Sequence, residues 1–252
     1  MSKKKVIAII QAHMSSSRLP GKVLLDLCGE PALYRMIERV RLCKNIDEIV
    51  VATSKMKCDD VLIEACQKWD VSTFRGSDHD VMARFYGTMQ AYPAEVYVRL
   101  TSDNPLIDAG HVDETIAFFL AHDYRYVRGA GTHLDDMFCE VFTAELMQET
   151  YENATEGYER EHVTPYMYTK QDSMYVRAID WDQVKYRLDL DTPEDYELIK
   201  HVYHALYQPG NRFTLEQIID YLDAHPEVRE LNSEIVQKHY TMCSYDSFDD
   251  QE

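Results

Sequence analysis

The sequence predicts an α/β fold with a mostly parallel sheet, and three observations support this class. Short apolar runs of strand length alternate with segments whose apolar residues recur at helical spacing. Polar loops follow several of these runs, as expected where parallel strands end and ligands bind. The chain has 252 residues, 45% of them hydrophobic, which is enough for one large domain or two small ones with a substantial core.

The expected elements follow one another in a regular order. Residues 6–10 form an apolar run typical of a buried strand, and residues 33–40 carry apolar side chains at the i, i+3, i+4, i+7 positions of an amphipathic helix. The further elements expected are a strand within 46–53, a helix at 59–69, a strand at 71–74, a helix at 81–91 and a strand at 96–100. This alternation favours βαβ units and therefore parallel strands.

The rest of the chain divides into an irregular segment and a helical end. Residues 123–185 are rich in Tyr, Glu and His without a clear period, which fits either an inserted hairpin or an interface lobe. Thr192 is expected to cap a helix with Pro193 at its first position, and residues 214–217 have capping-box spacing. We expect one domain over 1–205, with an insert at about 123–185, and a helical extension with an acidic tail over 206–252.

The composition argues against several classes of partner. The net charge is −18, so the chain is not built to bind nucleic acid or an anionic membrane. No stretch approaches the roughly 20 apolar residues of a membrane span. The six cysteines are scattered without zinc-site spacing, which indicates a reducing cytoplasm. An acidic protein that binds a polyphosphate must gather cations locally or recruit a divalent metal.

The most informative loop is QAHMSSSRLPGK, residues 11–22. It follows the first strand and combines three serines, a Pro-Gly turn and two cations, Arg18 and Lys22. Hydroxyls and backbone N–H groups can donate to phosphate oxygens, while the cations offset the phosphate charge. The loop matches neither the Walker A nor the G-x-G-x-x-G spacing. On residues alone, a polyphosphate site and a plain polar turn both remain open.

Two acidic positions are candidates for metal binding. Asp103 follows the strand at 96–100 and precedes Pro105, so it suits either Mg²⁺ or a simple Asn/Asp-Pro turn. Asp189 and Asp191 share a face if extended, and they repel unless a cation lies between them. A metal would satisfy this pair, but Arg187 could pair with Asp189 and Asp191 could lie in a helix cap.

Two polar stretches allow further roles. Residues 75–80 (RGSDHD) form either a binding loop or a plain turn before a helix. Residues 158–165 (YEREHVTP) could contact a polar acceptor such as a sugar acid, or could be a solvated helix end or a subunit contact. Their adjacent Glu161 and His162 exclude the H-E-x-x-H zinc motif. No G-x-S-x-G or Cys-nucleophile signature is present, and the sequence identifies no general base.

Six stretches together resemble the cytidylyltransferase family, which includes the CMP-sugar synthetases for ketodeoxyoctonate and sialic acid. The resemblance is strongest to its spore coat polysaccharide biosynthesis (SpsF) branch and covers about residues 5–205. The stretches, in family order, are QAHMSSSRLPGK (11–22), EIVVATS (48–54), FRGSDHDVMARFY (74–86), RLTSDNPLID (99–108), YEREHVTPY (158–166) and LDTPEDYELI (190–199).

The resemblance implies a Rossmann-like nucleotide-diphosphosugar transferase fold with a small inserted interface lobe. It also implies transfer of CMP from CTP to a sugar acid or related small polar acceptor, with release of pyrophosphate. Mg²⁺ is the implied cofactor, and the family and the aromatic middle segment favour a homodimer. The open alternatives are a glycosyltransferase, a nucleotidyltransferase for another phosphorylated acceptor, and a nucleotide-binding protein with little activity.

The resemblance also assigns residues by position. Arg18 and Lys22 would hold the triphosphate, and Asp103 and Asp191 would bind the metal; these four form the catalytic set. The nucleotide-binding positions are Gln11, Ala12, His13, Ser17, Arg18, Lys22, Ala52, Thr53, Ser54, Arg75, Ser77 and Ser102. The acceptor-side positions are Arg84, Arg160, His162, Thr164 and Arg187.

The chain departs from the family pattern at several positions, among them Ser102, which stands where the branch often has Gly. His13 stands where the family usually has Arg, so one permanent phosphate contact is lost or becomes pH-dependent, given an ordinary His pKa of about 6.5. Asn104 stands where the branch often has Cys, while Asp103 is retained. Asp189 is an added carboxylate beside Asp191.

Overall fold

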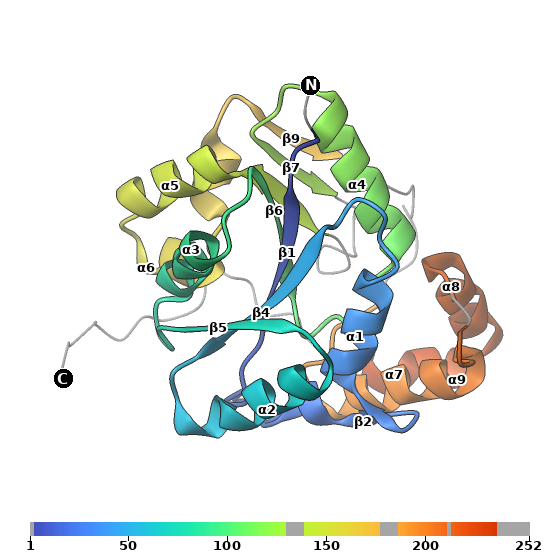
Figure 1. The fold of residues 1–252 in the computed structure, drawn as a ribbon. Coiled ribbons are helices and arrows are strands. Elements are labelled where there is room, and N and C mark those ends of the chain that lie inside the picture. Colours follow the sequence, from blue (N-terminus) through green and yellow to red (C-terminus); the bar gives the residue numbers. More distant parts are fainter. Residues whose placement is uncertain (1–2, 130–138, 177–185, 211–212, 236–252) are drawn as a thin grey trace.

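The computed structural model describes residues 3–129, 139–176, 186–210 and 213–235. Its centre is a seven-stranded sheet in the order β5-β4-β1-β6-β8-β7-β9, with helices on both faces (Figure 1). The four neighbouring strands β5 (Ser72–Gly76), β4 (Glu48–Ser54), β1 (Val6–Gln11) and β6 (Val96–Thr101) are all parallel. The predicted α/β class with a mostly parallel sheet is therefore confirmed.

The side chains of β1 point alternately to the two faces of the sheet, which explains why helices pack on both faces. Its even-numbered residues from Val6 to Ile10 belong to one apolar cluster, and Ile7 and Ile9 belong to another on the opposite face. Helices α1 (Ala32–Val40), α2 (Asp60–Lys68) and α4 (Ala109–Ala121) cover the first face, and α3 (Val81–Ala91) and α5 (Ala144–Asn153) cover the second. A strand buried on both faces gives the continuous apolar run seen in the sequence.

Short elements separate these larger ones. They are η1 (Lys22–Leu24), β2 (Asp26–Leu27), β3 (Glu30–Pro31) and η2 (Lys57–Asp59). The expected helix at 59–69 therefore begins as one 3₁₀ turn before α2, while the expected helix at 81–91 coincides with α3. Two carboxylates fix helix starts after strands, because Asp80 accepts from Ala83 N–H and Asp108 accepts from Gly110 N–H.

The middle segment, expected as an inserted hairpin or an interface lobe, contributes three strands to the central sheet. Its strands β8 (Glu140–Thr143), β7 (Tyr126–Gly129) and β9 (Ser173–Val176) extend the central sheet from β6, with β8 antiparallel to both of its neighbours. Helix α6 (Gly157–His162) contacts α3, and η4 (Pro165–Thr169) lies beside it. Strands of four residues are too short to show an alternating pattern, which hid them in the sequence. Part of the expected insert lies outside the described residues.

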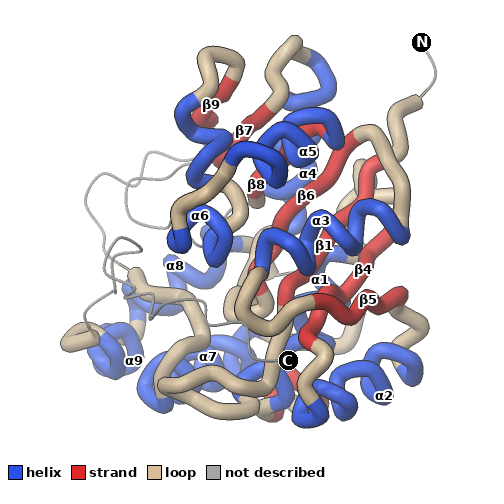
Figure 2. Tube along the Cα trace, turned by 90° about the vertical axis from the view of Figure 1, so that its left-hand side faces the viewer, coloured by secondary structure: helices blue, strands red, loops and turns tan. Residues whose placement is uncertain are grey.

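The helical end packs on the core near the carboxyl ends of the parallel strands. It contains α7 (Pro193–Leu206), α8 (Leu215–Ala224), α9 (Pro226–Arg229) and η5 (Glu230–Asn232) (Figures 1 and 2). Thr192 caps α7 as predicted and forms a capping box with Asp195, and Thr214 forms the predicted capping box of α8. Both helices belong to one apolar cluster with Leu27 and Leu106. The boundary at 205 stays a prediction, and the acidic tail lies outside the described residues.

Among the described residues, no helix is long and apolar enough to cross a membrane.

Candidate active site

Three segments that are distant in the sequence meet where the parallel strands end. Gln11, the last residue of β1, pairs in register with Ala52 on one side and Thr101 on the other. Asp103 follows two residues after β6, and its carbonyl accepts a 2.7 Å hydrogen bond from Leu190 N–H. This backbone contact places the segment before α7 beside the loop after β6.

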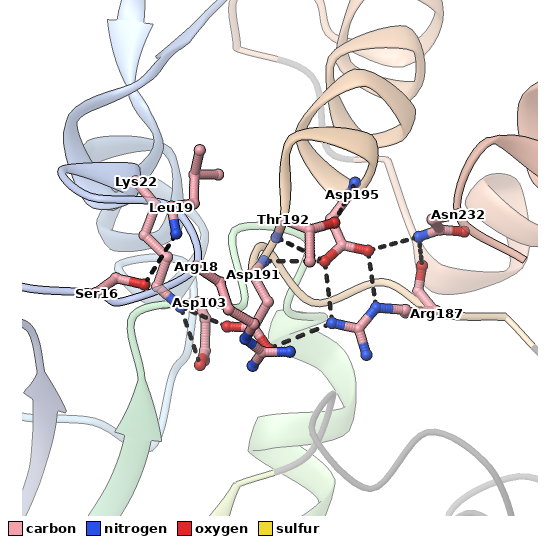
Figure 3. A network of polar contacts seen from close by, with 10 residues as sticks. All are labelled: Ser16, Arg18, Leu19, Lys22, Asp103, Arg187, Asp191, Thr192, Asp195 and Asn232. Carbon is pink, nitrogen blue, oxygen red and sulfur yellow. Dashed lines mark hydrogen bonds and ion pairs between the residues drawn. The ribbon is translucent and has the colours of Figure 1, made fainter. Parts of the chain in front are cut away.

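Lys22 lies between the two predicted metal aspartates. Its Nζ is 2.8 Å from Asp191 Oδ1 and 3.5 Å from Asp103 Oδ2 (Figure 3). Arg18 Nη2 is 2.5 Å from Asp191 Oδ2. The structure thus brings together all four residues of the predicted catalytic set, two cations from the β1 loop and two carboxylates from elsewhere in the chain.

Lys22 and Asp191 hold their charges at neutral pH. Burial acts to lower the pKa of Lys22, but Asp103 and Asp191 outweigh it and raise that pKa above its usual value. Burial acts to raise the pKa of Asp191, but the charges of Lys22, Arg18 and Arg187 keep it lowered. The ion pairs of this cluster can therefore be replaced on ligand binding: an anionic ligand can pair with the cations, and a metal cation can pair with the carboxylates.

The two aspartates fit a divalent cation. Asp103 Oδ1 is buried and has no hydrogen-bond partner among the described residues, while Asp103 and Asp191 both direct an oxygen at one point, the Lys22 amine. Carboxylate oxygens are the ligands Mg²⁺ prefers, and Mg²⁺ usually takes only one or two of them from protein in phosphate-handling sites. No group of three or more His, Cys, Asp or Glu side chains suited to a metal occurs within the described ranges. This is consistent with a two-carboxylate site completed by phosphate and water.

A second cluster holds Asp191 in place. Arg187 donates to both oxygens of Asp195, at 2.8 and 3.0 Å, and also lies 3.3 Å from Asp191 Oδ2. Asp195 Oδ2 accepts the backbone N–H of Asp191 at 3.1 Å and of Thr192 at 2.9 Å. Asn232 Nδ2 donates to Asp195 Oδ1 at 2.8 Å (Figure 3).

This cluster answers one question that the sequence left open. The cap of α7 is Thr192, so Asp191 does not cap the helix, and its carboxylate instead pairs with Lys22, Arg18 and Arg187. The sequence patterns did not indicate a role for Asp195 or Asn232. The capping-box position of Asp195, three residues after Thr192, was the available signal for the first.

The loop after β1 is closed on itself. Met14 C=O accepts a 2.9 Å hydrogen bond from Gly21 N–H, and Gly21 has φ +74°, a conformation that favours glycine. His13 Nδ1 lies 2.9 Å from Ser15 Oγ. Burial first, and then the charges of Arg84 and Lys22, lower the pKa of His13. The charges of Asp59 and Asp78 act the other way without outweighing them, so His13 is neutral at pH 7.

Asp59 is a central residue that the sequence analysis missed. Its carboxylate is fully buried and accepts from Met14 N–H, from both hydroxyls of Thr53 and Ser54, and from Ser54 N–H. Thr53 and Ser54, expected near the nucleotide, thus direct their hydroxyls at Asp59. An acid at the start of a helix, five residues after a strand-ending serine, was the only signal.

The region after β5 supplies one buried cation. A Cβ at Gly76 would lie 2.7–2.8 Å from atoms of Arg84, so only glycine allows this close approach. Arg84 Nη1 donates to Ser77 C=O at 3.1 Å, and its buried Nε has no partner among the described residues. Arg75 instead braces the ends of β4 and β5 through Ser54 C=O and Asp60. Arg84 is thus the predicted acceptor-side residue with a donor left to offer.

Two other predicted acceptor-side residues bind within the protein. Arg160 Nε donates to Asp80 Oδ2 at 3.0 Å, which ties α6 to the start of α3. Thr164 Oγ1 donates to Glu140 Oε1 at 2.6 Å, and Tyr126 and Tyr168 donate to the same oxygen. His162 ends α6.

Glu140 connects this region to Gln11. Its Oε2 forms an ion pair with Arg99, whose Nε donates to Gln11 Oε1 at 3.0 Å. Burial acts to raise the pKa of Glu140, but Arg99 and Arg128 outweigh it and lower that pKa. The sequence analysis also missed Arg99 and Glu140, although an arginine within the apolar β6 strand was a visible signal.

Comparison with known proteins assigns the family. The family described as Cytidylyltransferase matches residues 7–224. The chain belongs to the cytidylyltransferase family. It is 36% identical over 236 residues to the spore coat polysaccharide biosynthesis protein SpsF of Bacillus subtilis, covering 88% of this chain and 95% of that protein.

Solved structures agree with this assignment. A cytidylyltransferase from Leptospira borgpetersenii superposes with a TM-score of 0.84 at 31% identity, covering 94% of this chain and 100% of that one. A CMP:2-keto-3-deoxy-manno-octonic acid synthetase, determined in complex with CTP, shows the same fold with a TM-score of 0.63 at 17% identity, covering 81% of this chain and 100% of that one. The expected recognition, fold and enzyme class are confirmed, and this chain is a nucleotidyltransferase.

A separate cavity of this cytidylyltransferase lies away from the predicted residues. It measures about 410 Å³, and its lining includes Tyr34, Arg35, Arg39, Tyr203, Tyr207 and Phe213. Arg35 donates to the carbonyls of Leu27 and Cys28, and Arg39 donates to those of Leu106, Ile107 and Phe213. Both guanidinium groups therefore support the packing of α1 against its neighbours.

Proposed function

We propose that this cytidylyltransferase transfers CMP from CTP to a sugar acid or related acceptor and releases pyrophosphate. The observation that carries the proposal is the Lys22 amine held between Asp103 and Asp191, with Arg18 on the same carboxylate. The relationship to SpsF supports a role in surface polysaccharide or glycoconjugate synthesis. The scattered cysteines support a cytoplasmic location.

The cationic residues of the site are proposed to bind the triphosphate, and the carboxylates are proposed to bind the metal. Arg18 and Lys22 neutralise the triphosphate and align it, so that the acceptor oxygen bonds to the α-phosphorus as the bond to pyrophosphate breaks. Asp103 and Asp191 would hold Mg²⁺, which when bound supplies further neutralisation of phosphate charge. The net charge of −18 is thereby countered at one point rather than over the whole surface.

The remaining predicted residues fall into two groups: those proposed to contact a ligand and those that position other residues of the protein. Arg84, whose buried Nε has no partner among the described residues, is proposed to contact the nucleotide or the acceptor. Gln11 accepts from Arg99 through Oε1, so its amide nitrogen is the group available to a ligand. Arg160, Thr164 and Arg187 are proposed to position other residues of the protein. Their partners are Asp80, Glu140 and Asp195, respectively. We further propose a homodimer, which light scattering in solution tests.

A pyrophosphate-release assay tests the reaction. CTP, Mg²⁺ and a panel of sugar acids and sugar phosphates should give pyrophosphate with at least one acceptor, and UTP, ATP and GTP should give less. CTP binding without release for any acceptor would favour a nucleotide-binding protein. Consumption of a UDP-sugar instead would favour a glycosyltransferase.

Matched aspartate variants test the site. Asp103→Asn and Asp191→Asn should each lower kcat by about 100-fold or more, because each removes a carboxylate that pairs with Lys22 and would hold Mg²⁺ against the triphosphate. Asp189→Asn, in the same segment as Asp191, should stay within about threefold, because the Lys22 amine bonds to the other two aspartates. Unchanged turnover in either of the first two variants would contradict its role.

A further inference from the structure

We propose that Asp59 is the positioning residue of the triphosphate loop: its buried carboxylate fixes Met14, and through Met14 and Gly21 it sets the place of Lys22. The kinetic consequence rests on the proposed function, but the structural claim does not. Nothing in the family resemblance pointed to this residue.

The carboxylate of Asp59 is surrounded by donors. Oδ1 accepts from Met14 N–H at 2.8 Å, while Oδ2 accepts from Ser54 Oγ at 2.5 Å, Thr53 Oγ1 at 3.0 Å and Ser54 N–H at 3.2 Å. Burial acts to raise the pKa of Asp59, but these hydrogen bonds outweigh it and keep the group ionised. Asp59 therefore joins the loop after β1 to the end of β4.

A continuous path of bonds runs from Asp59 to the site. Met14 is held on both sides, because its N–H donates to Asp59 and its C=O accepts from Gly21 N–H at 2.9 Å. Gly21 then directs the chain into η1 with its positive φ, and Lys22 is the next residue. A shift at Met14 would therefore move the backbone that carries the Lys22 amine between Asp103 and Asp191.

The chemistry of the site requires an acid at this position rather than an amide. The hydroxyls of Thr53 and Ser54 can rotate and accept from an amide, but the N–H groups of Met14 and Ser54 cannot. Asp59→Asn keeps the size of the side chain yet places an NH₂ group against one of these two N–H donors. The loop anchor should therefore weaken while the surrounding core keeps its volume.

Amide hydrogen exchange on the ligand-free protein tests the structural claim. In Asp59→Asn, exchange at Met14 and Gly21 should accelerate by about tenfold or more, as expected for loss of a hydrogen bond to a charged group. The matched control is Asp47→Asn, because Asp47 Oδ2 accepts from Val6 N–H at 2.9 Å at the other end of β1. That control should accelerate exchange at Val6 and leave Gly21 unchanged. Wild-type exchange at Gly21 in Asp59→Asn would overturn the proposal.

Kinetics separate positioning from general destabilisation. Asp59→Asn should raise KM for CTP by about tenfold, whereas Asp47→Asn should not, even where both lower the melting temperature. If Asp59→Asn does not fold, Thr53→Val removes a single donor and should accelerate Gly21 exchange by a smaller factor; no acceleration there would also overturn the proposal. If the wild type shows no turnover with CTP, the proposed function fails, and the exchange data still decide the role of Asp59.

Discussion

His13 stands where the cytidylyltransferases usually carry arginine, and the structure gives this replacement a physical setting. The ring is half-buried near Arg84 and Lys22, and both cations add to the effect of burial in lowering its pKa. A neutral ring beside two cations avoids the repulsion that a third fixed charge would bring. The site therefore has one fewer permanent phosphate contact and one group that changes charge in mildly acidic solution.

This predicts a specific pH dependence of CTP binding. Because the pKa of His13 lies below 6.5, the ring is neutral at pH 7 and gains its charge only as the pH falls below that value. KM for CTP should therefore fall with decreasing pH in the wild type relative to His13→Asn, while the two variants agree between pH 7 and 8. Comparing the two proteins removes the titration of CTP itself. Parallel profiles from pH 5 to 8 would show that His13 does not contact the triphosphate.

At the scale of elements, the Glu140 cluster joins the parallel half of the sheet to its antiparallel half. Glu140 on β8 binds Arg99 on β6, Tyr126 on β7 and Thr164 before η4. Each member lies on a different element, so the network fixes how these elements are placed relative to one another. Its ionic centre is buried, with side-chain exposures of 13% for Arg99 and 7% for Glu140.

Breaking this ion pair should cost far more than breaking a surface pair. Glu140→Gln leaves the Arg99 charge buried and uncompensated, so the free energy of unfolding should fall by about 3–5 kcal/mol. Glu149→Gln, whose partners Arg125 and Lys170 are partly exposed, should cost less than about 1 kcal/mol. Urea unfolding followed by circular dichroism measures both values. Equal losses in the two variants would contradict the assigned importance of the buried pair.

At the scale of the whole molecule, an acidic chain gathers several cations at one place. The net charge of −18 is the sum over the sequence, while Arg18, Lys22 and Arg84 gather near the ends of β1 and β5. Ligand binding at this point connects the β1 loop, the loop after β6 and the segment before α7, which belong to distant parts of the chain. A bound nucleotide should therefore stabilise the entire fold.

Thermal unfolding measures this stabilisation. Mg²⁺ and CTP at about 100 times the dissociation constant add about 2.7 kcal/mol, which should raise the melting temperature by about 5–10 °C for a chain of this size. Removal of the metal with EDTA should abolish most of the shift, and UTP should give a smaller one. An equal shift for the Asp103→Asn/Asp191→Asn double variant would show that CTP binds without these carboxylates.

The sequence suggested the four residues of the predicted catalytic set only through its resemblance to a family. By its residues alone, the sequence determined the fold class and the order of the main elements. It could do so because hydrophobic periodicity reports which residues face a core, and because the helix caps at Thr192 and Thr214 depend on neighbours only three residues away. The six motifs added the family, because their residues and their order along the chain can be read directly from the sequence.

Only the tertiary structure decided what these residues contact. The hydroxyls of Thr53 and Ser54 donate hydrogen bonds to Asp59, and Arg187 donates to Asp195. The irregular middle segment adds three strands to the central sheet. Lys22 reaches Asp191 across 169 positions of the chain. Such pairings depend on strand order and on the packing of α7 at the carboxyl edge of the sheet. A local sequence pattern cannot predict them, because burial limits which residue type fits a position but does not determine which residue it contacts.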